Sequence, residues 1–173
     1  MGWTFKLHGG FAAVLGSVLL VLTALTWLPG TLPLTGAKWP LAVIVVLLFP
    51  IFVSALVRAL LARPHQDSLW PAFRCLPRKV QLGLGALVVS GFAMMVFSST
   101  GDGHLQSAEV KEGRYFAMDS TPQAHRTVEV TRSQYQVVLE SDQRMMFGIP
   151  GLLFVGAACV VLVAGELRRA DRD

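Results

Sequence analysis

Four apolar runs without an ionisable side chain constrain this chain more than any other feature of its sequence. They cover residues 11–28, 41–57, 80–98 and 145–165, and none of them contains Asp, Glu, Lys, Arg or His. Each run is close to the roughly 20 residues that an α-helix needs to cross about 30 Å of hydrocarbon. Charged residues make up only 15% of the chain, against about a quarter in soluble domains. The sequence therefore predicts an α-helical membrane protein built as a bundle of four transmembrane helices.

The first run is predicted to stay in the protein as a membrane helix. Lys6 and His8 precede it, as in the n-region of a signal peptide. However, the run is longer than an h-region of about 7–15 residues, and no small-residue cleavage site follows it. We therefore expect residues 1–98 to form three transmembrane helices. Residues 145–173 then form the fourth helix and a short tail.

Positive charge is concentrated in alternate segments between the runs, and this predicts the orientation. The segments 1–10, 58–79 and 166–173 hold nine basic and four acidic residues, for a net charge of +5. The segments 29–40 and 99–144 hold six basic and seven acidic residues, for a net charge of −1. Because short loops rich in Lys and Arg stay in the cytoplasm, both termini and the basic loop 58–79 are predicted to be cytoplasmic. The predicted location is multi-pass in the inner (plasma) membrane of a bacterial cell, with the lipid bilayer rather than nucleic acid as the partner of the basic charge.

Residues that anchor a protein at the membrane surface are predicted at both ends of the spans. Tryptophans fall at span ends as in an aromatic belt, and basic residues precede the third span. The predicted anchors are Trp3, Trp27, Trp39, Trp70, Arg74, Arg78 and Lys79. Two alternatives stay open for the loop 58–79: an ordinary positive-inside loop with an aromatic anchor, or a segment that recognises anionic lipid.

Small residues spaced four apart in three of the runs predict close contacts between helix backbones. The pairs are Ala12 with Gly16, Ala13 with Ser17, Ala55 with Ala59, and Ala86 with Ser90. We expect these pairs to pack within the bundle, with a dimer interface as the alternative.

The segment 99–144 is predicted to form a small extracytoplasmic antiparallel β element between the third and fourth spans. In the stretch 127–131, valine alternates with threonine and glutamate, which is typical of a strand with one buried face. The Lys-Glu-Gly sequence at 111–113 is predicted to form a turn between two further strand-like stretches. A β-hairpin or meander of two or three short strands is therefore expected here.

A helix is predicted to begin directly after the last strand. Thr131 and Gln134 form the T-x-x-Q pattern of a capping box, in which each side chain satisfies a backbone amide of the other residue. A helix over 132–165 would be about 50 Å long, which is more than a bilayer core requires. Pro150 leaves two alternatives: one kinked helix, or a new helix that begins near Pro150.

No pattern of catalytic, cofactor-binding or metal-binding residues is recognisable. Asp102, His104, Glu109 and His125 lie in the same outer segment, but their spacing matches no set of metal ligands. Transport and proton relay usually require an ionisable residue within a span, and the four runs contain none. We therefore predict no catalytic residue, no cofactor and no metal, and a protein that is not an enzyme.

The region 113–151 resembles uncharacterised actinobacterial four-span integral membrane proteins. In these proteins a tyrosine-rich strand, a V-x-V-[ST] strand end, a tyrosine-containing helix and an arginine just before a glycine-containing span follow in order. The corresponding residues here are Tyr115, Val128 to Thr131, Tyr135, Arg144 and Gly148. The resemblance implies no activity.

Two classes of function stay open from the sequence. The first is a non-enzymatic accessory or assembly subunit whose outer loop contacts a membrane-protein partner or a second copy of the chain. The second is an extracytoplasmic sensor or small-ligand-binding protein. The candidate partner contacts are Tyr115, Phe116, Met118 and Val128, whose structural alternative is to pack the sheet on the helix at Tyr135. Because strand residues alternate between faces, Tyr115 and Phe116 are expected to point in opposite directions.

Overall fold

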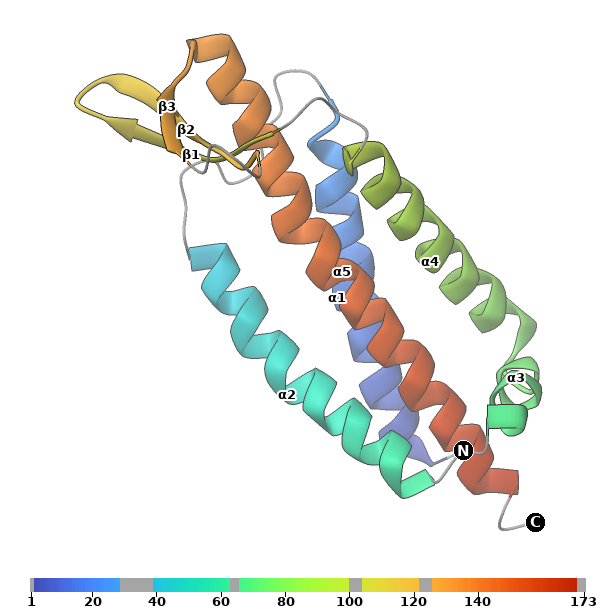
Figure 1. Ribbon diagram of the computed structural model, residues 1–173. Helices are drawn as coiled ribbons and strands as arrows, with labels where there is room; N and C mark the ends of the chain where they lie inside the picture. The colour runs from blue at the N-terminus through green and yellow to red at the C-terminus, as the bar shows by residue number, and fades with distance from the viewer. Residues whose placement is uncertain (1, 29–38, 63–65, 100–103, 122–125, 171–173) are drawn as a thin grey trace.

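The chain folds into a helical bundle that carries a small sheet at one end (Figure 1). The computed structural model describes residues 2–28, 39–62, 66–99, 104–121 and 126–170. The elements are α1 (Trp3–Leu25), α2 (Trp39–Ala62), α3 (Gln66–Arg74), α4 (Arg78–Ser99), β1 (Leu105–Lys111), β2 (Arg114–Asp119), β3 (Arg126–Glu129) and α5 (Arg132–Ala170). The start of α1 and the end of α5 lie at the end of the bundle opposite the sheet (Figure 1). We call these two ends the terminal end and the sheet end.

Four helices, α1, α2, α4 and α5, are long and apolar enough to cross a membrane. All four overlap the four apolar runs, so the predicted number and order of the long helices are confirmed in the described residues. Each helix begins before its run, because residues next to an apolar stretch can continue the same backbone hydrogen bonding, whereas α1 ends at Leu25, before the end of its run at Leu28. In particular, α1 begins at Trp3 and not near residue 11, so Lys6 and His8 belong to the helix. The His8 ring nitrogen Nε2 lies 3.2 Å from the Ile51 carbonyl oxygen of α2.

The helix α5 is the centre of the bundle, since α1, α2 and α4 all pack against it. Of its apolar span, 50% is buried, whereas only 11% of the α4 span is buried. Four of its side chains, Phe147, Phe154, Val155 and Val161, are among the largest that are fully buried. Most of the apolar surface of α2 and α4 therefore faces away from the protein.

The helices α1 and α5 approach closely where both lack side-chain bulk. A Cβ atom built on Gly16 would lie 2.7 Å from Val155 Cγ2 and 2.9 Å from the backbone oxygen of Gly151. Ala12 is also fully buried at this contact. The predicted packing role of Ala12 and Gly16 is thus confirmed.

The other small-residue pairs behave differently from one another. Ala55 of α2 is 2% exposed and belongs to the main core, while Ala59 is half-buried. Ala86 of α4 is exposed and Ser90 is half-buried, with its hydroxyl donating to the Leu87 carbonyl oxygen. The prediction that Ala86 packs inside the bundle is wrong. Spacing alone places two residues on one face of a helix, but it does not say which face meets a neighbour.

The helix α5 continues without a break through Pro150, which decides between the two alternatives at this position. Its 39 residues correspond to a length of about 58 Å at 1.5 Å per residue. This exceeds the roughly 30 Å of a hydrocarbon core. The part of α5 before its apolar span is therefore a projection from the bundle, and it carries the sheet (Figure 1).

The sheet is antiparallel, with the strand order β1-β2-β3.

In the predicted basic loop the structure has a short helix, α3, whose Trp70 and Phe73 rings are stacked with their centroids 5.9 Å apart. Trp70 is largely exposed, whereas Ala72 and Leu76 are buried against the bundle. This segment therefore lies along the terminal end with an aromatic side chain pointing outward.

Candidate functional site

One face of the sheet is packed on the projecting part of α5. Ala117 of β2, Val130 at the end of β3 and Val138 of α5 are buried together in a second small core. The rings of Tyr115 and Tyr135 contact each other with their centroids 4.9 Å apart. The sheet and the helix therefore form one unit, with a core separate from that of the bundle.

The start of α5 is fixed to the sheet by local hydrogen bonds. The backbone N–H of Thr131 donates to Gln134 Oε1 at 3.0 Å, and the backbone N–H of Gln134 donates to Thr131 Oγ1 at 3.3 Å. The predicted capping box is thus confirmed. The N–H of Val130 donates to the Tyr115 carbonyl oxygen at 2.9 Å. The strand β2 is therefore tied to the residue that directly precedes the cap of α5.

An irregularity in β1 adds a second connection to α5. The pairing of β1 with β2 shifts between Gln106 and Glu109, and Ser107 adopts a φ of 55°. At this bulge the N–H of Ala108 donates to Asp142 Oδ2 at 3.1 Å. A bulge turns a backbone group away from the ladder, and here the group binds a helix residue. This bulge could not be predicted from the sequence, because a serine in the left-handed conformation has no characteristic spacing.

The four candidate contact residues are divided between the two faces of the sheet. Tyr115 and Val128 belong to the core against α5, which is the structural role weighed for them. Phe116 and Met118 alternate with these residues along β2 and therefore lie on the opposite face. Phe116 is half-buried and Met118 is 42% exposed. We call the face that carries Phe116 and Met118 the open face.

Charged and polar side chains surround the two apolar residues of the open face. Phe116 is paired with Glu109 of β1 and with Glu129 of β3. Two ion pairs continue this rim: Lys111 with Glu109 at 2.8 Å, and Arg114 with Glu129 at 3.7 Å. Such exposed pairs contribute little to stability. The open face thus has a small apolar centre with a charged border.

At the far end of β2 the chain turns around Asp119. The N–H and the hydroxyl of Thr121 donate to Asp119 Oδ1 at 3.0 and 2.7 Å. These hydrogen bonds lower the pKa of Asp119 below its ordinary value, with smaller contributions from Arg126 and His104.

Within the described residues, no three His, Cys, Asp or Glu side chains gather in a way that could hold a metal ion. Asp102 and His125 lie outside the described residues.

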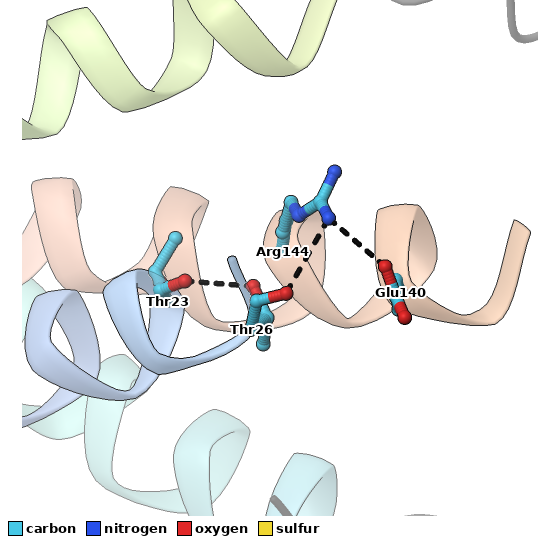
Figure 2. A network of polar contacts seen from close by, with 4 residues as sticks. All are labelled: Thr23, Thr26, Glu140 and Arg144. Atoms are coloured by element: carbon cyan, nitrogen blue, oxygen red, sulfur yellow. Dashed lines mark hydrogen bonds and ion pairs between the residues drawn. The ribbon is translucent and has the colours of Figure 1, made fainter. Parts of the chain in front are cut away.

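Where the projecting part of α5 enters the bundle, Arg144 joins α5 to the end of α1 (Figure 2). Its Nη2 donates to Glu140 Oε2 at 3.2 Å and to the Thr26 carbonyl oxygen at 3.4 Å. Its guanidinium carbon lies 4.5 Å from the centroid of the Trp27 ring. The Trp27 ring in turn meets Phe97 of α4 edge to face, with centroids 6.4 Å apart. Arg144 therefore links α5 to the end of α1, and Trp27 links that end to α4.

The contact of Arg144 with Trp27 was not predicted from the sequence, although two features of the sequence indicate it. The residue directly precedes an apolar run, and Trp27 lies at the end of another run. A cation beside an aromatic ring is a favourable contact when both lie at the same end of neighbouring spans.

The cavity beside Arg144 is only about 100 Å³ and is lined mainly by apolar side chains such as Met94, Met145 and Ile149.

The predicted anchor residues lie at the two ends of the bundle. Trp3, Trp39 and Trp70 are 72%, 61% and 67% exposed, while Trp27 is 43% exposed and also contacts Arg144. Arg74, Arg78 and Lys79 are exposed at the terminal end, between α3 and the start of α4.

Comparisons with protein-family models, with curated proteins and with solved structures find no match to this chain.

Proposed function

We propose that this chain is a multi-pass membrane protein that binds a partner protein through the open face of its sheet. Both termini are cytoplasmic, and α5 holds the sheet outside the membrane. The protein is then a non-enzymatic accessory or assembly subunit. The charge difference between the two sets of segments, +5 against −1, supports the orientation.

The observation that carries the proposal is the unequal use of the two faces of the sheet. One face packs on α5 around buried Ala117, whereas the open face presents Phe116 and Met118 within a charged rim. Protein interfaces combine an apolar centre, often with aromatic residues and methionine, with a polar border. The connections at Val130 and Ala108 hold this face in a fixed position relative to the bundle, so little ordering entropy is lost when a partner binds.

Among the described residues of the sheet end, the alternative of an extracytoplasmic small-ligand binder lacks comparable support. Ligand sites are usually clefts of about 300–1,000 Å³ with a few convergent polar groups. The cavity beside Arg144 is about 100 Å³ and mainly apolar. The geometry of the sheet end thus favours a protein partner.

The orientation predicts a specific pattern of cysteine labelling. Cys75 is exposed at the terminal end, and Val137 is 65% exposed on the projecting part of α5. In intact cells, a maleimide that does not cross membranes should label Val137→Cys and should leave Cys75 unlabelled until the cells are permeabilised. Labelling of Cys75 but not of residue 137 in intact cells would reverse the proposed topology.

The binding role predicts a position-specific crosslink. A photo-crosslinking amino acid at Met118 should give a discrete adduct in cells, and the same amino acid at Val137 should not. Phe116→Ser should reduce the Met118 adduct strongly, since loss of a central aromatic contact of about 2 kcal/mol weakens binding about thirtyfold. The mass of the adduct distinguishes a second copy from another protein. Equal crosslinking at both positions, or an adduct insensitive to Phe116→Ser, contradicts the role of the open face.

A further inference from the structure

A large cavity opens at the terminal end, between α1, α4 and α5. Its volume is about 860 Å³, which lies within the range of about 300–1,000 Å³ typical of ligand sites. We propose that this cavity binds one anionic phospholipid, with an acyl chain between α1 and α4 and the phosphate at the terminal end. The inference rests on the proposed membrane location, and it is independent of a partner on the sheet.

The cavity exists because two facing helices lack side chains there. Gly10 of α1 and Gly83 of α4 both line it, and a Cβ atom on either residue would meet nothing within 4 Å. At the sheet end the same helices are closer, since a Cβ atom on Gly91 would lie 3.4 Å from Leu20 Cδ2. The remaining inner wall is apolar and includes Leu84 and Leu162. A slot of this kind suits a hydrocarbon chain, for which an apolar wall is equivalent to lipid.

The mouth of the cavity differs chemically from its interior. Lys6 of α1 and Arg169 of α5 line it, together with Glu166. Exposed Arg78 and Lys79 follow directly after the lining residue Pro77. Basic pockets between membrane helices on the cytoplasmic side bind anionic lipid headgroups. An apolar slot below a mainly basic mouth therefore matches the two parts of an anionic phospholipid, whereas Glu166 opposes its phosphate.

Native mass spectrometry in mild detergent, with added dioleoyl phosphatidylglycerol or dioleoyl phosphatidylcholine, tests the proposal. The wild type should retain one phosphatidylglycerol more strongly than phosphatidylcholine. Gly83→Leu fills the slot and should lower retention at least about tenfold, a loss of about 1.4 kcal/mol. Gly85→Leu is the matched control, because Gly85 also has open space around it but does not line the cavity. Gly10→Leu fills the slot from the opposite wall and replaces Gly83→Leu if that variant does not fold.

Two substitutions at the mouth of the cavity should change the affinity for phosphatidylglycerol in opposite directions. Lys6→Gln should weaken phosphatidylglycerol binding about fivefold, and Glu166→Gln should strengthen it about fivefold, as expected for one charge near a headgroup. Neither should alter phosphatidylcholine binding. Equal retention of the two lipids, or equal effects of Gly83→Leu and Gly85→Leu, would overturn the proposal. Neither result would bear on crosslinking at Met118, so the two proposals can fail separately.

Discussion

Gly16→Ala is expected to lower the free energy of unfolding by about 1–3 kcal/mol, although alanine is the better helix former. The added methyl group would lie 2.9 Å from the Gly151 oxygen and 3.0 Å from the Val155 nitrogen. Both are backbone atoms, so neither can rotate away. The helix α1 would have to move from α5, and the contacts of buried Ala12 and Val155 would loosen. Unfolding by a denaturing detergent, followed by circular dichroism, measures the change.

Gly156→Ala supplies the matched control on α5. A Cβ atom on Gly156 would meet nothing within 4 Å. The same chemical change should therefore raise stability by up to about 1 kcal/mol, because only the helix propensity changes. Opposite signs for the two variants are the expected result. Stabilisation by both variants would show that α1 and α5 are not in close contact at Gly16.

Arg144→Met is expected to lower the free energy of unfolding by about 2 kcal/mol. Methionine keeps the apolar stem but removes the hydrogen bond to the Thr26 oxygen and the contact with the Trp27 ring. The Arg144 side chain is only 19% exposed, so water replaces these contacts incompletely. Hydrogen exchange should show faster exchange at the end of α1, with little change in the sheet core around Ala117.

Two further variants separate the contacts of Arg144. Glu140→Gln removes only the ion pair, which is partly solvated, and should cost less than about 1 kcal/mol. In a double-mutant cycle, Arg144→Met and Trp27→Leu should show a coupling of about 1 kcal/mol. If the two effects simply add, Arg144 does not hold α1 through Trp27. The hydrogen bond from Arg144 to the Thr26 oxygen would then be the remaining link to the end of α1.

The sequence predicted that the two aromatic residues of β2 lie on opposite faces of the sheet, but it did not predict which face is open. Alternation placed Tyr115 and Phe116 on opposite faces, and the structure has them so. The sequence does not indicate which face packs on α5, because Tyr115 and Phe116 are both aromatic. The next residues on the same two faces, Ala117 and Met118, are also both apolar. That choice depends on Tyr135 and Val138, which are on a different element.

The elements whose stabilising contacts are local could be predicted from the sequence. Four long apolar runs became four long helices, because a helix satisfies its backbone hydrogen bonds within itself. The capping box at Thr131 formed because its two partners are only three residues apart. Helix ends were less well determined: the additional turns of α1 include His8, which contacts Ile51 of another helix.

Which helix surfaces meet depends on tertiary packing and could not be predicted from the sequence. Among the four spans α2 is the most apolar, yet α5 is the most buried. Hydropathy cannot predict this, because lipid and protein interior are equally apolar surroundings for a side chain. Close packing depends on where small residues of two helices coincide, as Gly16 and Gly151 do. The same reason applies to three other features: the cavity beside Gly10 and Gly83, the link through Arg144 and the bulge at Ser107. Each involves residues that are far apart in the chain and meet only in the folded protein.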